Sequence, residues 1–235
     1  MTPEKDIKLH LGCGERYLDG YVNIDFPLSE HTLLRPRVDK YADFRTLQYP
    51  SASVVEIRAH HVFEHFNRVE ALGLLLQWRR WLKPGGVLHL ETPDFGRCAW
   101  YYVLSGRKTR MEIGRHVFGS QEAPWALHKD FWDKKKFLFV LGALGFRDIR
   151  LQRISNDLAG YFQSPFFNWI GMFLPLPAYK KFGKAKLPNI TVICRKSGAD
   201  IDERRAVREI LSQYLTGTEN NKLLEVWLGD VFRDK

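Results

Sequence analysis

The sequence predicts an α/β protein built on a twisted, largely parallel sheet with helices packed against it. Two observations predict this class. Short apolar runs alternate with amphipathic helical patterns along residues 7–154, as they do in repeated strand–helix–strand units. A turn bounded by Gly12 and Gly14 follows the first apolar run, at the edge where parallel sheets bind ligands. With 235 residues and 45% hydrophobic composition, the chain is long enough to bury one sizeable core.

The strands and helices follow from residue type and spacing. β-branched and apolar residues between turn signals predict strands at 7–11, 21–25, 54–59, 87–92, 146–154 and 190–195, with a weaker strand at 38–41. Residues 69–82 carry leucines on one helical face, and Lys83-Pro84-Gly85-Gly86 predicts a turn that ends this helix. A second helical pattern at 137–144 stops at Gly145, directly before a strand.

Two segments interrupt the alternation. Residues 156–188 are aromatic, proline-rich and then basic, and we expect them to form a lid or a docking surface. Residues 201–232 predict two helices, each with an apolar stripe that must be buried against the domain or against a partner, for example in a homodimer. We therefore expect a main domain over residues 1–198 and a helical extension over residues 199–235.

Composition narrows the cellular setting and the partners. The first ten residues are charged, and no run of 18 apolar residues occurs, so we expect a cytoplasmic protein. The three cysteines are widely spaced, which argues against a disulfide framework and against a cysteine-built zinc site. The net charge of +9 reflects either solvated faces or an anionic partner. Nucleic acid is disfavoured because the basic clusters are scattered and no RRM, KH or helix-turn-helix signature occurs.

The glycine turn predicts a nucleoside site without a pyrophosphate. Tyr17 stands where the third glycine of a GxGxxG dinucleotide motif would be, and the chain has no GxxxxGK[ST] phosphate loop. Bare backbone at Gly12 and Gly14 still permits close approach of a ligand. Asp25, at the end of the second strand, is then the candidate to hold the two hydroxyls of a ribose.

From residue 7 to about residue 154 the chain resembles the class I S-adenosylmethionine-dependent methyltransferases. The motifs occur in the family's order: LHLGCGER, the acid Asp25, the segment ADFRTLQYP, the segment HHVFEH (60–65) and WLKPGGVLHLETPD. The resemblance implies a Rossmann-like fold with an antiparallel last strand, S-adenosylmethionine as donor and S-adenosylhomocysteine as product. It implies cofactor contacts at these positions: Leu11, Gly12, Cys13, Gly14, Asp25, Phe26, Asp43, Phe44 and His60. Asp43 would bind the adenine amino group.

One departure from the family pattern is the short spacing between the turn and the acid. Ten residues separate Gly14 from Asp25, so the first helix must shrink to about a turn. This variant resembles a subgroup associated with bacterial surface-polysaccharide genes, which implies O-methylation of a saccharide or of a lipid-linked glycan. The alternatives are methylation of a small metabolite or of RNA, or a binding module that lacks turnover.

Methylation of a hydroxyl needs a base, and histidine has a suitable pKa. We expect His61 or His128 to be that base, while a histidine such as His60 or His65 can instead cap a helix or pack. Glu64 either orients a histidine, ligates a metal or lies on the surface, and Asp94 either faces the acceptor or caps the following helix. Because no HExxH or paired-acid spacing occurs, we predict no metal.

Aromatic residues suggest where an acceptor binds. We expect four aromatic residues either to stack on a sugar or to belong to the core: Trp100, Tyr101, Tyr102 and Trp125. Residues 162–186 combine aromatics with following lysines, which suits peripheral contact with the inner face of a membrane, or a hydrophobic lid.

Overall fold

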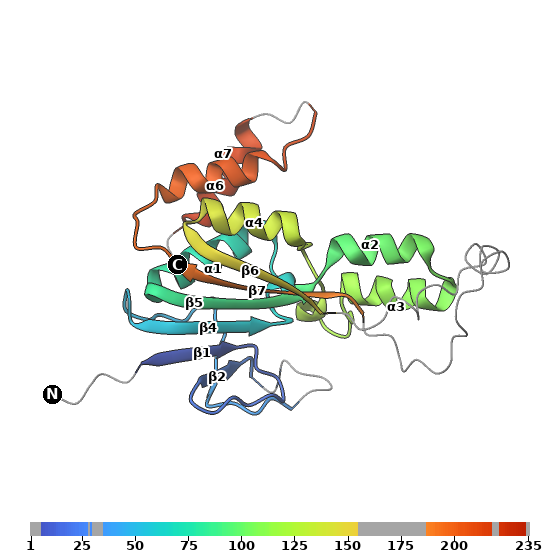
Figure 1. Cartoon of the computed structure of the whole chain (residues 1–235), viewed down its shortest axis with the longest axis horizontal. Coiled ribbons are helices and arrows are strands. Elements are labelled where there is room, and N and C mark those ends of the chain that lie inside the picture. The colour runs from blue at the N-terminus through green and yellow to red at the C-terminus, as the bar shows by residue number, and fades with distance from the viewer. Residues whose placement is uncertain (1–5, 28, 30–34, 155–186, 218–220, 234–235) are drawn as a thin grey trace.

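The computed structural model describes residues 6–27, 29, 35–154, 187–217 and 221–233. Its centre is a seven-stranded sheet with the order β3-β2-β1-β4-β5-β7-β6 (Figure 1). The strands are β1 (Ile7–Leu11), β2 (Val22–Asp25), β3 (Lys40–Tyr41), β4 (Val54–His60), β5 (Leu82–Pro93), β6 (Phe146–Ile154) and β7 (Asn189–Lys196). Strands β1 to β5 pair in parallel, and β7 runs antiparallel to both β5 and β6. The predicted Rossmann-like α/β fold with an antiparallel last strand is confirmed.

Four of the described helices begin at a polar side-chain cap. The described helices are α1 (Arg68–Trp81), α2 (Phe95–Leu104), α3 (Arg107–Phe118), α4 (Lys134–Ala143), α6 (Glu203–Ser212) and α7 (Asn221–Val231), with short 3₁₀ turns η2 (Phe63–His65) and η3 (Pro124–Ala126). Asn67 caps α1 in a reciprocal pair with Glu70, while Asp94, Asp133 and Asp202 accept backbone N–H bonds at α2, α4 and α6.

The C-terminal helices belong to the main core. Val207 and Leu211 of α6 and Leu228 of α7 are fully buried in the same cluster as Trp78 of α1. Figure 1 shows α4, α6 and α7 together on one side of the sheet. The apolar stripes, which were predicted to be buried against the domain or against a partner, thus contribute to the core of the chain itself. A homodimer through these helices stays a prediction.

The connection from β1 to β2 lacks even the single helical turn that the sequence predicts. Residues 12–21 are all described and contain turns but no helix. The buried Asn23 side chain replaces the helical hydrogen bonds, because it accepts from Leu18 N at 2.9 Å and donates to Leu18 O at 3.0 Å. A side chain on the second strand thus holds the loop that carries the glycines.

A second difference concerns the segment after α1. The predicted Lys83-Pro84-Gly85-Gly86 turn lies inside β5 as a bulge, because Leu82 pairs with Val54 and Val87 pairs with Glu56. Gly85 has φ +78°, the conformation that such a bulge favours in glycine. The helix therefore passes directly into strand β5, which continues to Pro93 beside the site described below.

Two predictions concern the region around the long insertion. The proposed lid or docking surface at 156–188, with the membrane-contact segment 162–186, lies outside the described residues apart from Leu187 and Pro188. None of the helices in the described ranges is long and apolar enough to cross a membrane.

Candidate functional site

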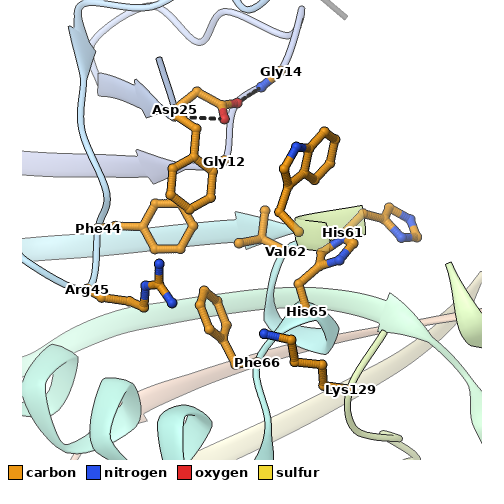
Figure 2. Close-up of a pocket in the computed structure, with 12 residues that line it drawn as sticks. Gly12, Gly14, Asp25, Phe44, Arg45, His61, Val62, His65, Phe66 and Lys129 are labelled. Carbon is orange, nitrogen blue, oxygen red and sulfur yellow. Dashed lines mark hydrogen bonds between the residues drawn. The ribbon is translucent and has the colours of Figure 1, made fainter. Parts of the chain in front are cut away.

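A pocket opens where the parallel strands end, and the glycine turn forms one end of it (Figure 2). Gly12 follows β1, has φ +64° and donates its N–H to Ile24 O at 2.8 Å. A Cβ at Gly12 would lie 2.0 Å from Val62 Cγ2, so only glycine fits there. Gly14 has φ +53°, but a Cβ there would meet no atom of the described residues within 4 Å. The turn therefore packs closely at Gly12 and leaves room for a ligand at Gly14.

Asp25 anchors this turn. It ends β2, is 5% exposed and accepts the Gly14 N–H at 2.6 Å and the Phe26 N–H at 2.7 Å. Figure 2 shows the carboxylate directed toward Gly14. Backbone amides thus hold a negative charge at the pocket wall next to bare main chain.

An apolar wall adjoins the acid. Phe26 and Phe66 pack against Phe44 with ring centroids 5.3 and 5.6 Å away, and all three residues line the pocket. Arg45 also lines it, while its guanidinium contacts the Asp43 carboxylate at 2.7 Å and Glu70 at 3.3 Å. The structure therefore turns the Asp43 carboxylate toward Arg45. The predicted contact of Asp43 with an adenine amino group stays a prediction.

His61 lies at the opposite end of the pocket, between two carboxylates. Its φ of +54° is unusual for a residue with a side chain. Its Nδ1 is 3.2 Å from Glu64 Oε1, and its Nε2 is 3.2 Å from Glu91 Oε1. Burial lowers the pKa of His61, but the hydrogen bonds and charges of Glu64 and Glu91 outweigh it and raise the pKa to about 10. Since the side chain is 42% exposed, solvent weakens this effect without reversing its direction.

Two further histidines lie beside Glu64. The rings of His65 and His128 are 4.7 Å apart. Their Nδ1 atoms lie 3.2 Å from main-chain carbonyls, Leu127 O for His65 and Val117 O for His128. Burial, above all, lowers the pKa of His128 to about 4, although the Glu64 charge acts in the opposite direction. His128 is therefore neutral at physiological pH, whereas His61 is a cation.

The structure brings together only part of the predicted site. The pocket wall includes Gly12, Gly14, Asp25, Phe26, Phe44 and His61. Leu11 is fully buried in the core, and Cys13 is 4% exposed with its thiol toward Arg37 O. His60 packs against the rings of His89 and His10, with centroids 4.6 and 6.2 Å away. None of these three residues lines the pocket.

Asp94 has the capping role that the sequence left open. It is 1% exposed, and its Oδ1 accepts the N–H of Arg97 in the first turn of α2. Its Oδ2 lies 3.3 Å from Arg153 Nε. Burial raises the pKa of Asp94, against the opposing effects of the Arg97 N–H and the Arg153 charge. The carboxylate thus belongs to the helix start rather than to an open acceptor surface.

Sequence reasoning missed several residues of the pocket wall and its surroundings. Arg45, Phe66 and Lys129 line the pocket, and Glu91 binds His61 from the neighbouring strand β5. Phe66 directly follows the HHVFEH segment, and Lys129 directly follows His128. Proximity to these predicted segments was the available signal. The position of Glu91 depends on the β4–β5 register, which pairs it with His60.

Comparison with known proteins gives similarity to solved structures alone. No family model matches the chain. No curated protein matches it either. A S-adenosylmethionine-dependent methyltransferase from Archaeoglobus fulgidus is 15% identical, with 82% of this chain and 88% of that chain covered and a TM-score of 0.47. One from Mesorhizobium loti is 14% identical, with 83% and 94% covered and a TM-score of 0.46. Since similarity at this level concerns the fold, the function is argued from the site.

Proposed function

We propose that the chain is an S-adenosylmethionine-dependent methyltransferase that methylates a hydroxyl of a saccharide or of a lipid-linked glycan. One observation carries the donor half of this proposal. A glycine turn with open space at Gly14, a carboxylate at Asp25 and a phenylalanine wall share one pocket at the carboxyl ends of parallel strands. These are the groups that a nucleoside without a pyrophosphate requires.

The residues present fit the donor chemically. Because Gly14 has no Cβ, a ligand in the space over this residue can approach the main chain closely. Asp25 would accept hydrogen bonds from ribose hydroxyls, and Phe26, Phe44 and Phe66 offer apolar ring surface to a base. The donor itself supplies the electrophilic methyl group, and the protein's tasks are binding, alignment and exclusion of water.

Removal of the proton from the acceptor hydroxyl requires a neutral base near the end of the pocket that contains His61. His61 is unsuited because Glu64 and Glu91 raise its pKa to about 10, which favours the protonated ring at neutral pH. His128 is neutral, and its Nδ1–H faces the Val117 carbonyl, so Nε2 retains a lone pair. Of the two predicted bases, His128 is therefore the better candidate for accepting a hydroxyl proton.

Aromatic side chains in the pocket and on α2 support a sugar acceptor. Trp125 lines the pocket, and its ring lies 6.3 Å from that of His65. On α2, Trp100 is 64% exposed and Tyr102 is 44% exposed, whereas Tyr101 is buried. Exposed aromatic faces of this kind stack on sugar rings. A cytoplasmic location, with contact to the inner membrane face through residues 162–186, would give access to a lipid-linked acceptor.

Two measurements test the proposal. Calorimetric titration with S-adenosylhomocysteine should show one binding site per chain, and Gly14→Val should abolish it because the added side chain fills the space above the turn. Transfer of radiolabelled methyl from S-adenosylmethionine should then be screened across saccharides, lipid-linked glycans, small metabolites and RNA. Absence of binding contradicts the donor half, and transfer only to a metabolite or RNA contradicts the acceptor half. Binding without transfer to any acceptor would favour a binding module.

A further inference from the structure

Beside the pocket, three potential metal ligands meet from two segments of the chain. Glu64 and His65 belong to η2, after strand β4, and His128 belongs to the loop after η3. One donor atom from each residue lies within 4.8 Å of the other two. We propose that Glu64, His65 and His128 bind a divalent transition-metal ion, with Zn²⁺ as the best match to two imidazoles and one carboxylate.

The orientation of both imidazoles supports metal binding. A main-chain carbonyl can only accept a hydrogen bond, so Nδ1 must be the donor in both His65 and His128. With Nδ1 as the donor, the tautomer that can bind a metal has its lone pair on Nε2 in both rings. Histidines that ligate metals typically donate the other ring N–H to a carbonyl or a carboxylate, which fixes the ring. The two rings are therefore held in the tautomer and orientation that a metal requires.

The burial and the unsatisfied oxygen of Glu64 also support a bound cation. Glu64 is 2% exposed, and its Oε1 contacts His61. Its Oε2 has no hydrogen-bond partner within the described part of the chain. A buried carboxylate oxygen without a partner is costly. Its closest imidazole contact on the proposed site is His128 Nε2, 4.0 Å from Oε1, which is too long for a hydrogen bond. A cation between these groups would satisfy the carboxylate.

Backbone hydrogen bonds hold the two segments together on either side of His128. Leu127 O accepts from His65, and Lys129 N donates to Glu64 O at 2.9 Å. Zn–N and Zn–O bonds of about 2.0–2.2 Å in a tetrahedron place donor atoms about 3.3 Å apart. The donor atoms, which now lie within 4.8 Å of one another, therefore need to approach by up to about 1.5 Å when the ion binds.

The ion would lie at the edge of the pocket, because His65 lines the wall and Figure 2 shows it at the end opposite Asp25. Three protein ligands leave one coordination position for water or for a substrate oxygen. If the proposed hydroxyl acceptor binds there, the metal lowers its pKa and the proton leaves to water. His128 would then act as a ligand rather than as the base, and this last step rests on the proposed function.

Zinc titration of the full-length, chelator-treated chain against a chromophoric chelator tests the site. The wild type should bind one Zn²⁺ per chain. His65→Ala and His128→Ala should each weaken binding by more than the roughly 10–100-fold that is lost when only a hydrogen-bond partner of a metal ligand is removed. Glu64→Gln should do the same. His89→Ala is the matched control, since His89 lies on β5 near His60, and it should bind like the wild type.

Binding of Co²⁺ gives a second readout, because a histidine-ligated cobalt ion has a visible absorption band that should be lost in His65→Ala. His65 is only half-buried, so this variant should keep its fold even where Glu64→Gln does not. Wild-type zinc affinity in both histidine variants, or no stoichiometric binding by the wild type, would overturn the proposal. Neither measurement uses a methyl donor, so failure of the metal site and failure of S-adenosylhomocysteine binding are separate results.

Discussion

The two ends of the pocket differ in the groups that line them. At one end, Gly12 and Gly14 present main chain, and Asp25 is held by backbone amides. At the other, His61, Glu64 and their neighbours form a network of charged and titratable side chains. The first end relies on conformational freedom, and the second relies on charge. This difference suggests that one end binds a ligand by shape, while the other performs chemistry that involves protons or a metal.

The difference also predicts which property a substitution at each end should change. A substitution in the glycine turn should alter folding and donor binding, because the turn is packed against Val62 and fastened to Asp25. A substitution in the histidine cluster should alter turnover or pH dependence with little effect on donor binding. The following variants test this separation.

The largest expected effect is on turnover in His128→Ala. His128 is either the general base or a ligand of the proposed metal ion. In both cases its loss should lower the rate of methyl transfer roughly 10²–10⁴-fold. Affinity for S-adenosylhomocysteine, measured by calorimetry, should stay unchanged, and His89→Ala should retain the wild-type rate. If His128→Ala also turns over at the wild-type rate, the histidine end has no part in proton removal.

A large loss of stability is expected for Gly12→Ala. The new Cβ would meet Val62 Cγ2 at 2.0 Å and the residue would keep a left-handed φ, so the free energy of unfolding should fall by about 2–4 kcal/mol. Gly14→Ala meets no neighbour and should lose only about 1–2 kcal/mol. Urea denaturation of both variants measures the contrast. Equal losses would mean that Gly12 is not packed as described.

A smaller effect is expected for donor affinity in Asp25→Ala. Loss of the carboxylate removes the proposed acceptor for the ribose hydroxyls and releases the Gly14 N–H. Binding of S-adenosylhomocysteine should weaken by roughly 1–3 kcal/mol. Calorimetry with Asp25→Asn, which keeps the side-chain volume, separates the loss of charge from the loss of packing. Unchanged affinity in both variants would exclude this acid from the donor site.

The smallest effect is a pH dependence at the histidine end. The pKa of His61 is raised from 6.5 to about 10, so its ion pairs contribute their full stability below pH 6.5 and lose it as the pH rises toward 10. The stability difference between the wild type and His61→Gln should therefore shrink over that range. Given the exposure of this side chain, the change should be about 1 kcal/mol or less.

Urea denaturation in chelator-containing buffer between pH 6 and pH 10 measures this change. The loss caused by Gly12→Ala should stay constant over the same range, because it is steric. A His61→Gln difference that grows with pH would reverse the assigned sign. It would show that His61 is neutral in the folded protein.

The glycine end could be predicted from the sequence because its determinants are local. The turn, the strand that precedes it and the acid that ends the next strand lie within residues 7–25, and the motif order indicated their roles. The spacing predicted a first helix of about one turn, but residues 12–21 contain no helix. The Asn23 hydrogen bonds that take the place of this helix could not be predicted, since a buried asparagine carries no distinctive pattern.

The histidine end could be predicted only in part. HHVFEH and His128 were recognised as candidates, but which of them is charged depends on groups that arrive from elsewhere in the fold. Glu91 comes from β5 and Asn189 from β7, and both lie near His61 only through strand register. Register is a tertiary property, so the sequence left His61 and His128 as equal alternatives. In the structure the pKa of His61 is raised and the pKa of His128 is lowered.

A crystal structure of the chain with S-adenosylhomocysteine tests the central claim most directly. We expect its adenosine against Phe44 and the glycine turn, with the ribose hydroxyls within hydrogen-bond distance of the Asp25 carboxylate. The sulfur should point toward the end of the pocket that contains His65. Clear density for the ligand at another place, or a saturated crystal whose glycine turn contacts no ligand, would contradict the account.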